Sequence, residues 1–177
     1  MSTMSPGLRR LALTTHVTAS VGWLGAVVVA LSLSVVTMTS QDIGLARAAA
    51  RSLEMVGWAA LIPFSVASLI TGLVQSLGSR WGLFRHYWVL VKLVMNVFAT
   101  TVLLLYMQTL SHLSEVAARP TLTSDDLAIL QSPSPAVHGT GALVLLLLAV
   151  VVSVYKPPGM TPYGARKHLE RRSTARR

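Results

Sequence analysis

Four apolar stretches, each about as long as a bilayer is thick when helical, constrain the fold of this 177-residue chain more than any other feature. They cover residues 11–38, 56–77, 87–107 and 136–155, and about 20 apolar residues in a helix span the hydrocarbon core. Lipid offers the backbone no hydrogen-bond partners, so stretches of this length form helices. The sequence therefore predicts an all-α protein: a four-helix transmembrane bundle in residues 1–160, followed by a basic tail in residues 161–177.

The composition agrees with membrane insertion and narrows the cofactor chemistry. Only 12% of the residues are charged and 53% are hydrophobic, whereas a soluble domain carries about 25% charged residues. The chain has no cysteine, which excludes disulfides and thiolate ligands. Any metal or haem must therefore be held by histidine, methionine, lysine or oxygen ligands.

The net charge of +9 follows the predicted topology. With four spans, the segments before the first, between the second and third, and after the fourth lie on one side of the membrane. That side holds most of the basic residues: Arg9, Arg10, Arg80, Arg85, Lys156, Arg166, Lys167, Arg171, Arg172, Arg176 and Arg177. The other side holds Arg47, Arg51 and Arg119 together with five of the six acidic residues. The positive-inside rule then predicts a multi-pass plasma-membrane protein with both termini in the cytoplasm, and the charge does not indicate a nucleic-acid partner.

Lys92 is the one charged residue inside a predicted span, where an unpartnered charge costs a few kcal/mol. It follows Arg85 by seven residues, and His16 follows Arg10 by six, so both lie roughly 10 Å inside their basic flanks. Two nitrogen ligands at one depth suit axial coordination of haem b. His86, at the cytoplasmic mouth, is a second candidate partner for His16. The alternative is that Lys92 snorkels to the interface and His16 is a hydrogen-bonded polar group.

Polar residues at helical spacing predict which helix faces point into the bundle. Lys92, Asn96 and Thr100 share one face of the third span. The second span carries Pro63, which predicts a kink. It also has a stripe of small and polar residues: Ser65, Ser68, Gly72 and Gln75.

A second set of candidate ligands is predicted at the external ends of the spans. His112 and His138 lie there, with Met38 and Met107 at a similar height. Imidazole and thioether ligands suit copper, or an outer haem. Methionine is equally an ordinary core residue, so the sequence leaves both interpretations of this set open.

Several short motifs carry a family resemblance. The first span has His16 followed by Gly22-Trp23-Leu24-Gly25, and the second ends in Thr71-Gly72. The link has Trp81-Gly82, and the third span has Trp88 four residues before Lys92-Leu93. Through these motifs, about half of the chain resembles the bacterial CopD-like and HemJ-like membrane proteins, including small actinobacterial relatives.

The HemJ-type resemblance implies a haem-b protein whose axial ligands are the first-helix histidine and the third-helix lysine. Those positions match His16 and Lys92 here. Residues 26–35 lack the aromatic and arginine residues of the HemJ type, and CopD-type proteins have more spans. Neither protoporphyrinogen oxidation nor copper import is therefore carried over to this chain.

Three functions are consistent with the sequence. The first is a haem-b membrane protein, either an electron-transfer protein or a haem-dependent oxidoreductase, whose partner is a quinone or a redox protein. The second is a copper-handling protein that uses the external His/Met set. The third is a cofactor-free accessory subunit in the lipid bilayer. Each is compatible with a homo-oligomer.

The charge placement predicts which positions a membrane-impermeant thiol reagent reaches. In this cysteine-free chain, Asp125→Cys should be labelled in intact cells, and Arg172→Cys only after permeabilisation. Labelling of position 172 in intact cells would contradict the predicted topology.

Overall fold

The computed structural model describes residues 4–78 and 82–174, with side chains described as far as Glu170. Its named elements are all helical, which confirms the predicted fold class. In chain order they are α1 (Pro6–Thr39), α2 (Ile43–Val56), the π-helical segment η1 (Gly57–Leu61), α3 (Ile62–Gly78), α4 (Tyr87–Ala118), α5 (Ser124–Leu130), α6 (Ser134–Tyr155) and α7 (Pro162–Thr174). Some residues used above lie outside the described structure: Arg80, Trp81, Arg176, Arg177 and the side chains of Arg171 and Arg172.

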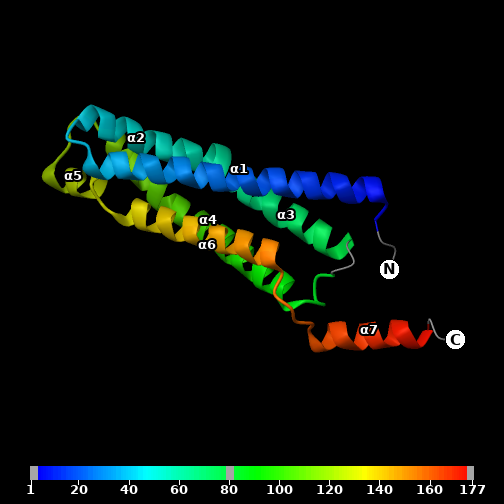
Figure 1. Cartoon of the computed structure of the whole chain (residues 1–177). Helices are drawn as coiled ribbons and strands as arrows, with labels where there is room; N and C mark the ends of the chain where they lie inside the picture. The colour runs from blue at the N-terminus through cyan, green and yellow to red at the C-terminus, as the bar shows by residue number, and fades with distance from the viewer. Residues whose placement is uncertain (1–3, 79–81, 175–177) are drawn as a thin grey trace.

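Four helical stretches are long and apolar enough to cross a membrane, as in a multi-pass membrane protein. They are Pro6–Thr39, Ile43–Gly78, Tyr87–Ala118 and Ser124–Tyr155. Figure 1 shows that α1 begins and α6 ends at the same end of the bundle, beside α7. We call this the basic end; the opposite end, which carries α5, is the outer end.

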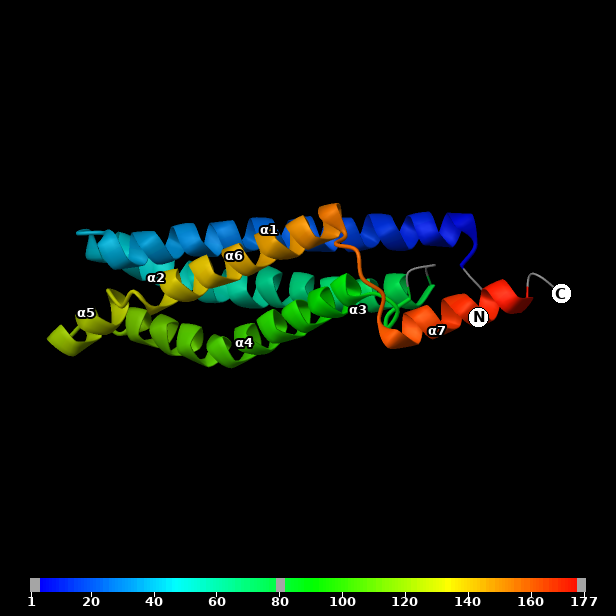
Figure 2. The ribbon, with the colours of Figure 1, turned by 60° about the horizontal axis from the view of Figure 1, so that its bottom comes forward.

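The four stretches pack as a ring. Helix α1 contacts α3 and α6, and α4 contacts α3 and α6 as well. Helices α1 and α4 therefore occupy opposite corners, with α3 and α6 at the other two (Figures 1 and 2). This arrangement lets side chains of α1 and α4 face each other across the interior.

Local sequence explains where the first helices begin. The side-chain oxygen of Ser5 accepts from the backbone N–H of Leu8 at 3.4 Å, and Pro6 occupies the first turn. Asp42 caps α2 by accepting from the N–H groups of Gly44 and Leu45. Ser40, two residues earlier, is the C-cap of α1.

The segment η1 ends at Leu61, two residues before Pro63, where the sequence predicts a kink. Proline has no N–H, and its ring clashes with the carbonyl four residues earlier, at Ala59. A π-helical turn at that point changes the hydrogen-bond register without ending the helix. As a result α2, η1 and α3 form one continuous span.

The packed core lies toward the outer end and extends beyond the predicted spans. The third predicted span ends at residue 107, but α4 continues to Ala118 and α5 follows. The cause is an amphipathic extension, which a hydropathy pattern does not reveal because its other face is polar. Its buried residues join those of α1, α2 and α5 in one cluster: Trp23, Ala26, Val27, Ala30, Ala50, Leu53, Leu61, Met107, Leu110, Leu113, Val116, Ala117 and Leu130.

The basic tail contains a helix, α7, that the sequence did not predict. The hydroxyl of Thr161 donates to the Phe84 carbonyl at 2.5 Å, and its backbone N–H donates to the Arg85 carbonyl at 3.0 Å. Gly164 lies so close to the Arg85 carbonyl that an added Cβ would sit 2.4 Å from its oxygen. The start of α7 is thus fastened to the link before α4.

Arg47 of α2 fastens the outer end of α4, and its loss should destabilise the fold. Its Nε donates to the Ala117 carbonyl at 2.6 Å, and its Nη2 donates to the Arg119 carbonyl. We expect Arg47→Ala to lower the free energy of unfolding by about 1–2 kcal/mol, because helix-end carbonyls lose a charged donor. The measurement is thermal unfolding in detergent. Arg51→Ala, one turn away and exposed, is the matched control and should change stability by less than about 0.5 kcal/mol. Equal effects of the two substitutions would contradict the role of Arg47.

Candidate functional site

A cavity of about 870 Å³ lies between α1, α3, α4 and α6 at the basic end. Its size falls within the roughly 300–1,000 Å³ typical of small-molecule and cofactor sites. Leucine and valine side chains, Trp23 and Trp88 supply most of the wall. The polar and charged residues of the lining are Arg9, Arg10, His16, Ser20, Ser68, Gln75, Ser76, Lys92, Asn96, Ser153 and Lys156.

His16 is held in one orientation by α3. Its Nδ1 lies 3.1 Å from Thr71 Oγ1. The Thr71 hydroxyl has a single proton, which it donates to the Ala67 carbonyl at 2.6 Å. It therefore accepts from His16, so Nδ1 carries the hydrogen and the neutral ring keeps its lone pair on Nε2. A hydrogen bond at one nitrogen that frees the other is the arrangement found for metal-ligating histidines.

Gly72 lets the imidazole lie against α3. A Cβ placed there would be 3.1 Å from Cε1 of His16 and 3.6 Å from its Nδ1. A glycine at this position therefore gives His16 the space that its hydrogen bond to the preceding residue, Thr71, requires.

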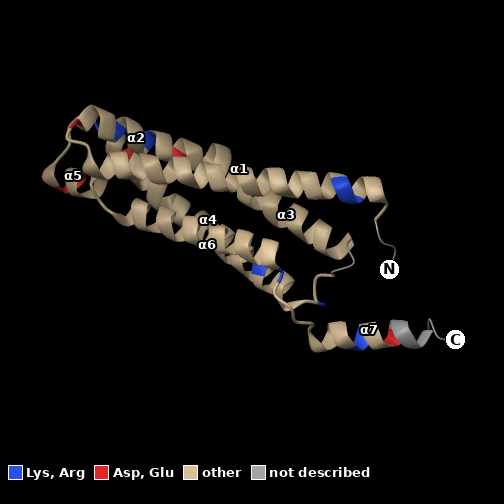
Figure 3. Cartoon of the chain, in the orientation of Figure 1, with Lys and Arg blue, Asp and Glu red and all other residues tan. Residues whose placement is uncertain are grey.

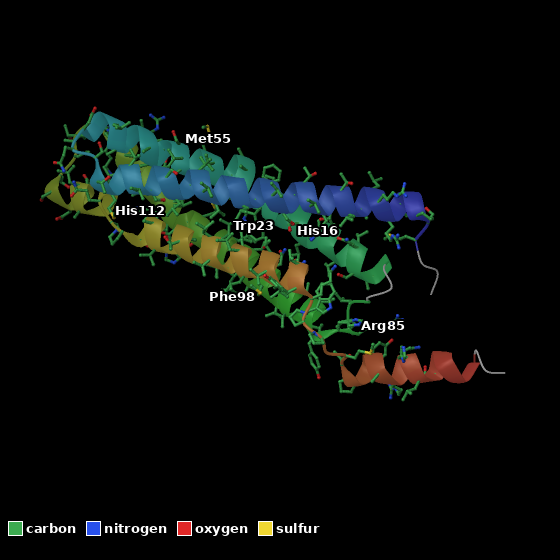
Figure 4. The ribbon with its side chains drawn as sticks, in the orientation of Figure 1. His16, Trp23, Met55, Arg85, Phe98 and His112 are labelled. Atoms are coloured by element: carbon green, nitrogen blue, oxygen red, sulfur yellow. The ribbon has the colours of Figure 1, made fainter. Side chains whose placement is uncertain are left out.

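Lys92 reaches the same cavity from α4, at the opposite corner of the ring. Its side chain is half-buried, and within the described part of the chain its ammonium group has no hydrogen-bond or ion-pair partner. Lys92 and His16 thus line the same cavity from α4 and α1. Figure 4 shows His16 on the stretch of α1 toward the basic end, with Trp23 farther toward the outer end.

A chain of hydrogen bonds crosses the bundle next to this pair. Ser20 Oγ lies 3.0 Å from Ser68 Oγ, and Asn96 Nδ2 donates to Ser68 Oγ at 3.3 Å. Thr100 extends the chain by donating to Asn96 Oδ1 at 3.5 Å. Both polar faces predicted from the sequence therefore point inward and bond to each other.

The predicted alternative ligand, His86, lies outside the described lining of the cavity. It is the residue that precedes α4, and its backbone pairs with that of Met160. The structure thus places His86 in the contact between the link and the segment that leads into α7.

The second set of candidate ligands, which the sequence predicts at the external ends of the spans, has separate surroundings. The ring of His138 stacks on Tyr106 with centroids 4.0 Å apart, and its Nδ1 donates to the Ser134 carbonyl at 2.9 Å. Met107 is buried in the core against Gly57. Met38 is half-buried, and His112 is exposed near α5 (Figure 4). Among the described residues, no three histidine, aspartate or glutamate side chains form a group able to hold a metal ion.

The cavity is positively charged. Arg9, Arg10, Lys92 and Lys156 line it, and none of the described lining residues is acidic. Figure 3 shows basic residues of α1 and near the end of α6 at this end, and the acidic residues of α2 and α5 at the other. Such a cavity favours an anionic ligand with an apolar body.

Sequence reasoning treated Thr71 and Gly72 as motif residues, and Arg9, Arg10 and Lys156 as topology determinants. These residues meet at one cavity only because of how the helices are rotated about their axes. The sequence does not give that rotation. The one available signal was the spacing of Arg9, Leu13, His16 and Ser20, which places them on one face of α1.

Comparisons with protein-family models, curated proteins and solved structures find no match for this chain. The chemistry of the cavity therefore carries the functional argument. It offers an imidazole nitrogen and an amine on opposite helices, apolar walls and a cationic opening.

Proposed function

We propose that this chain is a membrane haem-b protein for electron transfer, in which His16 and Lys92 would hold the iron. The observation that carries the proposal is the pair itself: an imidazole held through Nδ1 by Thr71, and an amine, both lining one cavity of about 870 Å³. The HemJ-like resemblance, which implies the same two ligands, supports it from the sequence.

The donor set and the cavity fit haem. Nitrogen ligands from two sides suit a six-coordinate iron, and apolar walls suit the face of a porphyrin. When bound, haem b supplies one-electron chemistry at its iron. The chain's own residues hold and orient it: Thr71 fixes the ring of His16, and Trp23 and Trp88 help to exclude water. Coordination by Lys92 requires the neutral amine, so its ammonium proton is released on binding.

The setting of this site follows from the charge distribution. We place the protein in the plasma membrane with its basic end in the cytoplasm, which puts the cavity in the cytoplasmic half of the bundle. A membrane quinone or a redox protein would be the electron-transfer partner at this site.

The visible spectrum of detergent-purified protein from haem-replete cells tests the proposal. We expect a Soret band and a six-coordinate, low-spin spectrum. His16→Ala should lose most of the haem, because one of the two ligands is removed. Lys92→Leu should give a five-coordinate, high-spin spectrum, and Lys92→Met should shift the spectrum while keeping most of the haem, since a thioether can replace the amine.

His112→Ala is the matched control, since it removes an exposed histidine at the other end, and its spectrum should be unchanged. A folded protein without colour would reject haem binding in favour of the cofactor-free accessory subunit. Copper found by metal analysis and lost with His112→Ala/His138→Ala would instead support the copper-handling alternative.

Gly72→Ala should weaken the haem site without unfolding the protein. The new methyl group would press on the His16 ring, which must shift by a few tenths of an ångström and so loses its alignment. Disturbing the group that orients a ligand typically costs about tenfold or more in affinity. The measurement is haem retained per protein after exchange into haem-free detergent. Gly25→Ala, where an added Cβ meets nothing within 4 Å, is the control and should retain haem as the wild type does.

A further inference from the structure

Cationic residues from two helices lie at the opening of the cavity. Arg9 and Arg10 enter it from the first turns of α1, and Lys156 enters from the end of α6. All three are exposed, whereas His16 and Lys92 are half-buried. We call Arg9, Arg10 and Lys156 the basic rim.

The basic rim lies at one depth of the cavity, and His16 and Lys92 lie at another. Arg9 precedes His16 by seven residues, so the two share a face of α1 and lie roughly 10 Å apart along its axis. A ligand that uses both levels needs an apolar body with acidic groups at one edge. Five of the six acidic residues of the chain belong to the outer end, so the chain itself supplies few counter-charges here.

The backbone at Lys156 adds a second, independent observation. Lys156 has φ 43° and ψ 65°, and it is the one described residue other than glycine with a positive φ. Helices that end in this left-handed conformation usually have glycine or asparagine there, since a Cβ is disfavoured. A glycine would fit this backbone better but would remove the side chain that reaches the cavity. Strained backbone of this kind is typical of functional positions.

We propose that the basic rim binds the two propionate groups of the haem, so that the macrocycle lies with its acidic edge toward the cytoplasmic opening. The inference rests on the proposed function, because it assigns the residues that recognise the acidic edge of the same ligand. Arginine and lysine bind carboxylates through charge-assisted hydrogen bonds. The site therefore selects free-acid tetrapyrroles over their esters.

Titration of haem and of haem dimethyl ester into protein from haem-limited cells tests this selection. Soret absorbance and quenching of tryptophan fluorescence report binding, since Trp23 and Trp88 line the cavity. Arg10→Gln and Lys156→Gly should each weaken haem binding by about threefold to tenfold, and the two together by about tenfold or more, as expected for exposed charged contacts. Binding of the diester should stay within about twofold of the wild type.

The stability of Lys156→Gly and a control substitution on α7 distinguish loss of the rim charge from a general effect on the protein. Lys156→Gly removes the charge at a position whose backbone suits glycine, so its melting temperature should equal or exceed that of the wild type. Arg166→Gln, on α7 and outside the described lining, removes the same charge at the same end and should change neither affinity.

The outcomes separate the two proposals. Equal weakening of haem and diester by the rim variants, or an equal effect of Arg166→Gln, overturns the rim assignment while haem binding stands. A wild type that binds neither ligand overturns haem binding and the rim together. A further experiment adds phosphatidylglycerol to phosphatidylcholine nanodiscs that hold the haem-loaded protein. If this lipid displaces haem from the wild type but not from the double variant, the rim is a lipid-headgroup site and the propionate assignment fails.

Discussion

The hydroxyl of Ser68 joins three helices inside the bundle, and the rest of the site depends on this junction. It contacts Ser20 on α1 at 3.0 Å and Asn96 on α4 at 3.3 Å. In lipid these polar groups have no alternative partner, so the network fixes how α1, α3 and α4 are rotated about their axes. His16 lies four residues before Ser20, and Lys92 lies four before Asn96. One helical turn separates each pair, so the rotation that satisfies the network also directs both nitrogen groups into the cavity.

The two halves of the bundle differ in packing: one has a packed core and the other has the cavity. Toward the outer end, the Ala-rich face of α2 packs closely on the extension of α4, and Arg47 holds the carbonyls at the end of that extension. Toward the basic end, α1 and α4 occupy opposite corners around a cavity of about 870 Å³. A cavity of that size lacks the packing contacts that a filled core would make. The packed outer half supplies the stability that allows the other half to remain open.

The features that the sequence predicted are those that depend on local pattern. The four spans and the inward faces of Ser68 and Asn96 follow from hydropathy and helical period. The extension of α4 and helix α7 were missed, because they are stabilised by contacts with α2 and with the link, which are distant in sequence. The roles of Thr71 and Gly72 were missed for the same reason: each depends on a histidine that lies on another helix. A shared height was sufficient to suggest His16 with Lys92, but it gave no information on the rotation of the helices that carry the external ligands.

The basic residues at one end have two possible roles, orienting the chain in the membrane and binding a ligand. Composition alone does not distinguish these roles. A charge that only orients the chain acts from any position on the correct side of the membrane. A charge that binds a ligand must lie on a particular helix face, as Arg9 does, two helical turns before His16. Lys156 meets a stricter condition, since its side chain reaches the cavity from a backbone conformation that disfavours lysine. Orientation of the chain would be served as well by a lysine at a neighbouring position with ordinary helical backbone, so the positive-inside rule does not account for a lysine in this conformation.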